Sequence, residues 1–386
     1  MHIRLITEEG EFKALRTEWN SLVAKSPNDV PHLSHEWMTA WWNNFSAGNR
    51  LNILAVYDPD GTLSGIAPLM KGRAKYRGIW VDKLQMMANG HSPNTNIIAR
   101  EGRLEQIVEA LFDYLNGIED WDIMELFKLE QNDPAFKVLL EKLKKQKRLF
   151  GVKDNFETPY IKIQSSWDDF LSKKSQRFRK SIRNKLNRAK NIGGLSFEKI
   201  PICDSGDSAF HDMLKVSGSS WKRRFGTDLA SNPSIQGFYR ELCDMMGKKG
   251  LITLWAIKKD SVMIAFEFHI TYNGISYPIR ADFDESYNSV SPGSLLEYNI
   301  IKTLFEDSSV KEYNTCGYTY FYLMNWTELT RKQSTIEIFN RHLKPVVLYF
   351  LEYRIIPVLR HLKLTGPRKT DHHKVHHIPC NQPAGT

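Results

Sequence analysis

The sequence predicts an α/β protein built from two similar units in tandem, each with a mixed sheet. At 386 residues the chain is too long for one ordinary core, and two domains are the default expectation. An apolar content of 41% with 12% aromatic residues excludes global disorder. One order of predicted elements occurs twice along the chain. In each copy, hairpin strands precede a strand–helix–strand crossover, which implies at least one parallel strand pair.

The first half begins with a short strand at residues 3–6 and two helices, of which the second starts at Ser34. Trp37, Trp41 and Trp42 give that helix a bulky apolar face that we expect in a core. Apolar strands at 51–57 and 63–70 flank the sequence DPDG, which is a strong hairpin signal. An irregular segment is expected at 79–98, with helices at 104–115 and 134–148 and strands at 121–127 and 159–163.

The second half repeats this order. Strands are expected at 195–200, 251–258, 262–272, 275–283, 311–316 and 336–339, and helices at 208–219, 234–246 and 291–305. We therefore divide the chain into domains at 1–165 and 166–345, followed by an amphipathic helix and a disordered tail at 346–386. The helix, which extends over 345–363 and is interrupted at Pro357, is expected either to pack on the second domain or to lie on a membrane surface.

The most unusual stretch is Asp169–Lys190, which carries nine Lys or Arg residues and one acid. Its apolar residues recur at helical spacing in a narrow stripe, Ser172 is a candidate N-cap, and Gly193-Gly194 ends the helix. One interpretation is a solvated charged helix. The other is a helix that lines an anion site, because the acids that would pair with these bases at i,i+4 are missing.

Charge and composition restrict the partners. The net charge of +9 is close to what the basic helix alone supplies, so the basicity is local and favours a specific anionic ligand over a uniformly nucleic-acid-binding surface; we expect no DNA partner. The four cysteines form no CxxC pair and show no metal-ligand spacing, so we expect reduced thiols and no metal. We also expect no signal peptide, no bilayer-spanning run and a cytoplasmic location.

A second anion-binding feature lies at Ser291-Pro292-Gly293-Ser294, where a turn-rich loop leads into a helix. Proline suits the first helical turn, glycine allows a ligand to approach the backbone, and the free N–H groups of a helix start bind phosphate. The same four residues are also compatible with a plain helix N-cap. Two such features in one unit favour a phosphorylated ligand.

These residues resemble a known family. Blocks at residues 35–70, 170–190, 219–242, 279–304 and 316–326 are similar to the CelD/BcsL-type branch of the GCN5-related N-acetyltransferases (GNAT superfamily). This branch is associated with cellulose and exopolysaccharide biosynthesis and is built like the double-GNAT FemABX proteins. One departure is that Tyr322 is followed by Leu323, where many relatives carry lysine.

The resemblance implies a tandem of two GNAT-like domains and acyl transfer from acetyl-CoA or another acyl-CoA. Ser291, Pro292, Gly293 and Ser294 would take the place of the pyrophosphate loop. The residues expected to bind the substrate or its phosphates are Lys173, Lys174, Arg177, Lys180, Trp221 and Arg280. The acceptor would be an amine or hydroxyl of an amino sugar or cell-envelope precursor, with possible contact to the inner membrane or an exopolysaccharide synthesis complex.

Acyl transfer needs a base for the acceptor, donors for the oxyanion and an acid for the thiolate, but no covalent nucleophile. The candidate bases are Asp282 and Glu267, with His269 as a third; the candidate acids are Tyr287 and Tyr320. Each also has a structural interpretation, such as turn capping for Asp282 or an outward-facing polar position for Glu267. Two alternatives remain: a FemABX-like transferase using aminoacyl-tRNA, which we consider the less expected partner, and a non-catalytic scaffold.

Overall fold

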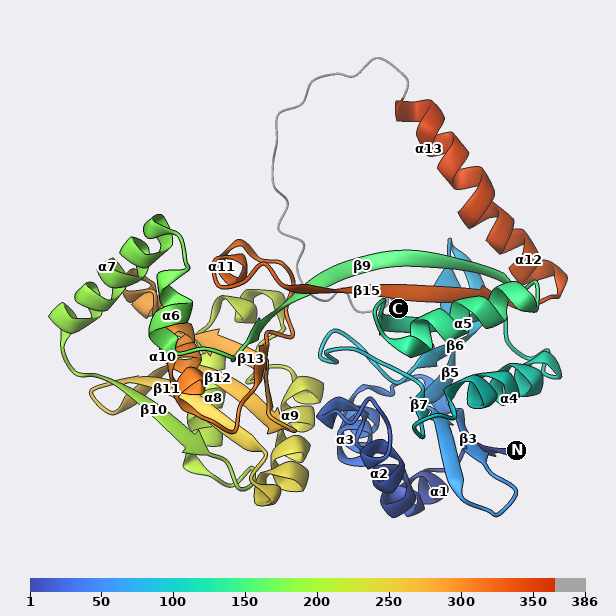
Figure 1. Cartoon of the computed structure of the whole chain (residues 1–386), viewed down its shortest axis with the longest axis horizontal. Coiled ribbons are helices and arrows are strands. Elements are labelled where there is room, and N and C mark those ends of the chain that lie inside the picture. The colour runs from blue at the N-terminus through green and yellow to red at the C-terminus, as the bar shows by residue number, and fades with distance from the viewer. Residues whose placement is uncertain (365–386) are drawn as a thin grey trace. The chain divides into compact units, whose positions relative to one another are not determined.

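The computed structural model describes residues 1–364 and contains two compact units (Figure 1). The first unit comprises residues 1–29, 46–155 and the chain from 333 onward. The second comprises residues 30–45 and 156–332, so each unit includes segments from both sides of residue 165. The expected disordered tail at 365–386 lies outside the described residues.

The first unit contains two sheets. The smaller is antiparallel, with the order β1-β3-β4-β7: His2–Ile6, Ile53–Tyr57, Leu63–Ala67 and Ile98–Ala99. The larger has the order β15-β8-β6-β5-β2: Thr330–Phe339, Ile123–Glu130, Ile79–Met86, Leu69–Tyr76 and Asn49–Leu51. Strands β3 and β4 form the hairpin predicted from DPDG, and β6 and β8 are parallel. Strand β6 falls in the segment that we expected to be irregular, and that expectation was wrong.

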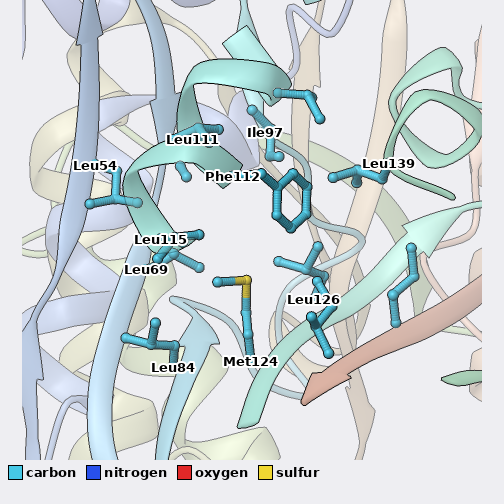
Figure 2. Close-up of a cluster of buried hydrophobic side chains, with 14 of the residues drawn as sticks. Leu54, Leu69, Leu84, Ile97, Leu111, Phe112, Leu115, Met124, Leu126 and Leu139 are labelled. Carbon is cyan, nitrogen blue, oxygen red and sulfur yellow. The ribbon is translucent and has the colours of Figure 1, made fainter. Parts of the chain in front are cut away.

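The core of the first unit lies between its strands and helices. The helices are α1 (Glu9–Ala14), α2 (Arg16–Ala24), α4 (Leu104–Asn116) and α5 (Pro134–Lys145). Helix α4 presents Leu111, Phe112 and Leu115 to apolar side chains from the strands and from α5 (Figure 2). The sequence predicted α4 and α5 because their apolar residues recur at helical spacing.

The second unit has one mixed sheet in the order β10-β11-β12-β13-β14-β9. Its strands are Leu195–Pro201, Ile252–Lys259, Val262–Tyr272, Ile275–Phe283, Glu312–Asn314 and the second half of Leu149–Lys162. Strands β13 and β14 are parallel, which confirms the predicted parallel neighbour. They share only the register pairs Ile275–Glu312 and Ser276–Tyr313, so most of β13 has no described partner on that edge.

Helices cover both faces of this sheet. They are α3 (His35–Phe45), α6 (Trp167–Ser172), α7 (Gln176–Ile192), α8 (Ser208–Gly218), α9 (Pro233–Met246), α10 (Pro292–Glu306) and α11 (Phe321–Met324). Short 3₁₀ helices occupy Pro31–Leu33, Trp221–Phe225, Gly247–Lys249 and Glu285–Val290.

Helix α3 belongs to the second unit although it follows the first two helices in sequence. Trp37 packs edge-on against Phe238 of α9, with ring centroids 5.2 Å apart. The two helices approach closely at Gly237, where an added Cβ would lie 2.1 Å from Asn44 Oδ1. The predicted core role of the α3 tryptophans is confirmed, since Trp37, Trp41 and Trp42 are all buried.

The C-terminal helix is continuous: α12 (Leu343–Phe350), a π-helical turn at Leu351–Ile355 and α13 (Ile356–Leu364). Pro357 lacks the N–H that an α-helical turn would use, and a wider turn accommodates it without ending the helix. The expectation that this helix packs on the second domain was wrong. Leu348, Tyr349 and Tyr353 pack against apolar residues of the first unit.

Candidate functional site

The candidate site is in the second unit, where the basic helix α7 lies beside the first turn of α10. Lys185 Nζ donates to Ser294 Oγ at 2.7 Å, and Arg188 Nη1 donates to the carbonyl of Ser289 at 2.8 Å. Helix α7 begins after Ser175, whose hydroxyl accepts from the Phe178 N–H, and ends at Gly193 with a φ of 66°. The predicted end is confirmed, whereas the predicted cap at Ser172 is wrong because that residue ends α6.

The bases that meet α10 are not those that the resemblance selected. Lys173 pairs with Asp169 at 2.7 Å, and Lys174 donates to the carbonyl of Trp326. Burial lowers the pKa of Lys174, which also lies over the ring of Phe170. Arg177 and Lys180 are exposed. The structure therefore brings Lys185 and Arg188 to the turn in place of the earlier bases.

The Ser291–Ser294 turn is shaped as the start of a helix. Ser291 adopts a left-handed conformation with φ 56°, its side chain makes no capping hydrogen bond, and Pro292 follows as the first helical residue. A Cβ at Gly293 would meet only Phe283 Cδ1, at 3.8 Å, so packing does not require glycine here. The absent side chain leaves room for a ligand beside the Gly293 N–H, whereas the N–H groups of Ser294 and Leu295 donate to the Ser291 carbonyl.

Glu267 and Asp282, the two candidate bases, lie on opposite faces of the sheet. Glu267 pairs in register with Ala281, whereas Asp282 pairs with Phe266. Because side chains alternate along a strand, Glu267 points to the face that carries α10 and Asp282 to the face that carries α8. Only Glu267 therefore lies on the same face of the sheet as the helix with the anion-binding turn.

Glu267 belongs to a buried hydrogen-bonded chain. His269 lies 3.0 Å from the Glu267 carboxylate through Nε2 and 2.8 Å from Ser276 Oγ through Nδ1. The hydroxyl of Tyr313 donates to Glu267 at 3.4 Å. Burial raises the pKa of Glu267 to about 8 and lowers the pKa of His269 to about 3, so the imidazole is neutral near neutral pH.

Glu297 of α10 is a second buried carboxyl at this site. Burial first, and then the nearby Glu267, raises the pKa of Glu297 to about 8. Glu297 is four residues after Gly293, and residues at this spacing share a helix face. Burial also lowers the pKa of Lys185, an effect that Glu297 opposes. The buried carboxyls, the open turn and the basic helix thus belong to one neighbourhood.

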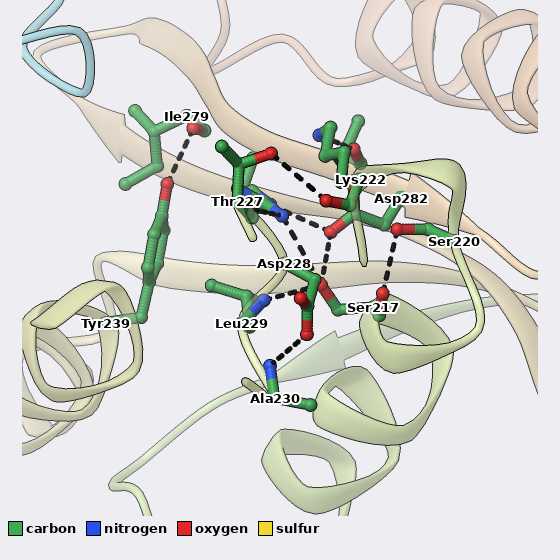
Figure 3. Close-up of polar contacts among 12 residues, drawn as sticks. Ser217, Ser220, Lys222, Thr227, Asp228, Leu229, Ala230, Tyr239, Ile279 and Asp282 are labelled. Atoms are coloured by element: carbon green, nitrogen blue, oxygen red, sulfur yellow. Dashed lines mark hydrogen bonds and ion pairs between the residues drawn. The ribbon is translucent and has the colours of Figure 1, made fainter. Parts of the chain in front are cut away.

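Asp282 is the centre of a different buried network (Figure 3). Its carboxylate accepts from Ser217 Oγ at 2.7 Å and pairs with Lys222 at 2.6 Å and Arg280 at 2.8 Å. Burial alone would raise the pKa of Asp282, but the two cations outweigh it and lower that pKa. A carboxylate stabilised in this way is a poor proton acceptor and a good anchor for the 3₁₀ helix at Trp221–Phe225.

Arg280 is committed to the same network. Its guanidinium also donates to the carbonyl of Thr227 at 2.9 Å, and the side chain is buried. These contacts hold the group against the α8 side of the sheet, where it cannot contact a phosphate at the α10 turn. We therefore correct the expectation that Arg280 binds phosphate.

The remaining predicted aromatic residues lie around the unit. Tyr287 packs at the edge of the core that contains α10, in the segment just before the turn. Tyr320 is 43% exposed and stacks on Tyr322 with centroids 5.6 Å apart. Tyr322 is 53% exposed as a whole, while burial of its hydroxyl, followed by the charges of Glu297 and Glu267, raises its pKa. Trp221 is 39% exposed, with its ring edge-on to Phe225.

A cavity of about 300 Å³ lies between α6, α7 and α10. Its lining combines apolar side chains with two arginines of the basic helix, one acid and one hydroxyl: Leu171, Ile182, Leu186, Tyr298, Arg179, Arg183, Asp168 and Ser172. Tyr298 is one helical turn beyond Ser294 on α10. The cavity therefore borders the same face of α10 that Lys185 contacts.

Comparison with known proteins agrees with this geometry. Residues 176–322 match the acetyltransferase (GNAT) domain family, a span that includes α7, Glu267, the turn and Glu297. The crystal structure of FemX is 14% identical, with a TM-score of 0.56 over 91% of this chain and 100% of that chain. The C-terminal domain of a putative lysylphosphatidylglycerol synthetase from Agrobacterium fabrum is 11% identical, with a TM-score of 0.53 over 93% and 100%.

A conserved protein of unknown function from Bacteroides thetaiotaomicron is 12% identical, with a TM-score of 0.53 over 88% of this chain and 100% of that chain. A comparison with curated proteins gives no match. The fold class is therefore the one predicted, a tandem of two GNAT-like α/β units, and the family match lies within the second unit.

The sequence prediction missed Glu297, Tyr313 and Tyr322. A signal for Glu297 exists, because this acid interrupts an apolar helix face between Leu296 and Ile300. A charged residue on such a face is uncommon unless it has a partner or a function.

Proposed function

We propose that the protein is an acyltransferase that moves an acetyl or longer acyl group from acyl-CoA to an amine or hydroxyl acceptor. The observation that carries the proposal is the contact of the basic helix with the open start of α10, through Lys185 to Ser294 and Arg188 to Ser289. The acetyltransferase family match over this same segment supports it.

The diphosphate of coenzyme A would bind at the first turn of α10. Backbone N–H groups at a helix start favour an anion, and Lys185 and Arg188 would add two cations beside it. Arg179 and Arg183, which line the neighbouring cavity, would hold a further phosphate of the cofactor or of the acceptor.

Glu267 is the proposed general base. A carboxyl with a pKa of about 8 is an effective proton acceptor near neutral pH, because its basicity matches the operating range. As the acceptor nitrogen or oxygen attacks the acyl carbon, Glu267 takes its proton, the new C–N or C–O bond forms, and the C–S bond breaks. The neutral His269 would position the Glu267 carboxylate, and the hydroxyl of Tyr322 would protonate the leaving thiolate.

The acceptor class follows from the resemblance to the CelD/BcsL-type branch. We propose an amino sugar or another exopolysaccharide or cell-envelope precursor, in the cytoplasm. A phosphate-linked glycan precursor would match the positive charge of α7. In this proposal the second unit, residues 30–45 and 156–332, is catalytic, and the first unit supports it.

The test is calorimetric titration of the full chain with coenzyme A, followed by detection of free thiol from acetyl-CoA with a panel of amino sugars. We expect binding, and turnover that Glu267→Gln abolishes. Binding of aminoacyl-tRNA without binding of any acyl-CoA would support the FemABX-like alternative. A cellular phenotype that survives Glu267→Gln but not deletion of the chain would support the scaffold.

A further inference from the structure

The C-terminal helix carries an exposed apolar face. While Pro345, Leu348 and Glu352 are buried against the first unit, large apolar side chains on the other side of the helix are 46–79% exposed. They are Leu343, Val347, Phe350, Ile355, Val358 and Leu359. In Figure 1, α13 extends clear of the strands of its own unit.

The π-helical turn keeps these side chains in one stripe. Leu343, Val347 and Phe350 are spaced at four and three residues, as an α-helix requires. Phe350 to Ile355 is a step of five residues, which is about one turn in a π-helix. Leu359 then follows Ile355 at four residues. The extra residue in the π-helical turn therefore keeps Ile355 and Leu359 on the same face as Phe350, whereas a regular α-helix would place them on another side.

A second exposed apolar element lies beside this helix. Arg77, at the turn between β5 and β6, pairs with the buried Glu352 of the helix at 2.5 Å. The next apolar residues, Ile79 and Trp80, are 43% and 47% exposed. Arg73 and Lys75 lie over the Trp80 ring, at 5.6 and 5.3 Å from its centroid. An exposed tryptophan among bases is typical of a side chain at a membrane–water interface.

The charges around both elements are positive. Arg354 and Arg360 are exposed on the same helix as the apolar stripe. The acidic residue in the described part of this helix is Glu352, which is buried and paired with Arg77 and Lys153. An apolar face bordered by arginines matches an anionic lipid surface.

We propose that the C-terminal helix and the tip of the β5–β6 hairpin form a membrane-docking surface that binds an anionic bilayer at its interface. The apolar stripe and Trp80 would insert at headgroup depth, and Arg354, Arg360, Arg73 and Lys75 would contact anionic headgroups. The surface belongs to the first unit and does not depend on the proposed transfer reaction. Among the described residues no helix is long and apolar enough to cross a bilayer.

The test is cosedimentation of the full chain with vesicles of phosphatidylcholine alone or mixed with an equal amount of phosphatidylglycerol. We expect binding to the mixed vesicles that added salt weakens. The double variant Phe350→Ser with Leu359→Ser should weaken binding about tenfold or more, since each exposed side chain loses its apolar insertion. Val262→Ser, which removes a side chain that is 64% exposed in the second unit, is the matched control and should bind as the wild type does.

Three results would overturn the proposal. The first is that the wild type does not sediment with mixed vesicles. The second is that the double variant binds as tightly as the wild type, which would assign lipid binding to α7. The third is that sedimentation velocity shows a lipid-free dimer that the double variant loses, which would assign the stripe to contact with a second copy of the chain. If the double variant does not fold, Arg354→Glu with Arg360→Glu replaces it, and unchanged binding to mixed vesicles again counts against the surface.

Discussion

Replacing Gly293 with aspartate separates a structural role of the α10 start from a ligand-binding one. Gly293 is the second residue of α10, and an added side chain meets only ordinary contact with Phe283. Aspartate at this place should fit the fold. It also puts a negative charge on the position where we propose that the cofactor diphosphate binds.

The two effects have opposite signs. Removing a helical glycine and adding an acid near a helix N-terminus should raise the free energy of unfolding by about 0.5–1 kcal/mol. Repulsion between this carboxylate and a phosphate about 4 Å away costs about 4 kcal/mol near a protein surface. Affinity for coenzyme A should therefore fall by at least about a hundredfold while stability stays equal or rises.

The assay pairs chemical denaturation with calorimetric titration of coenzyme A. Ser234→Asp is the matched control, because Ser234 is exposed and occupies the same position after Pro233 in α9. We expect Ser234→Asp to leave the affinity unchanged. Equal affinity of Gly293→Asp and wild type for coenzyme A would refute the placement of the diphosphate at this turn. A large loss of stability would refute the conclusion that a side chain at residue 293 meets only ordinary contact with Phe283.

Further predictions concern single side chains. With Glu267 as base, kcat/KM should rise with pH until about pH 8 and then level off, and Glu267→Gln should abolish both activity and this profile. Because the pKa of Glu267 is raised in the folded state, the stability that its protonated form contributes is fully present below about pH 4.5 and is lost as the pH rises towards 8. In denaturant titrations, the free energy of unfolding of Glu267→Gln should lack this part of the pH dependence. Lys185→Ala should weaken coenzyme A binding about tenfold or more in calorimetry, whereas Lys190→Ala on the exposed side of α7 should not. Asp282→Asn should lower the free energy of unfolding by about 3–5 kcal/mol, since the buried Arg280 guanidinium would lose its charged partner, and denaturation equal to wild type would contradict the anchoring role.

Local patterns were sufficient for most elements of the fold. The apolar spacing of α4 and α10 and the DPDG sequence predicted two helices and a hairpin that the structure contains, because short-range periodicity determines them. The membership of α3 in the second unit was not predictable in this way. It depends on the contact of Trp37 with Phe238, two residues that are far apart in sequence.

The candidate site was predicted as a region more reliably than as residues. The basic helix and the Ser291–Ser294 turn were identified by residue type and do meet. The rotation of α7 about its own axis determines which of its basic residues reaches the turn, and this rotation cannot be predicted from the composition of the helix. The difference between Asp282 and Glu267 likewise depends on their partners: two cations hold one carboxylate charged, and burial without a cation keeps a proton on the other.

A crystal structure of the full chain with bound coenzyme A tests the central claim most directly. We predict that the diphosphate lies at the N–H group of Gly293, within hydrogen-bond distance of Lys185 or Arg188, and that the thiol lies on the Glu267 face of the sheet. Coenzyme A bound away from the α10 start, or with its thiol on the Asp282 face, would contradict the account.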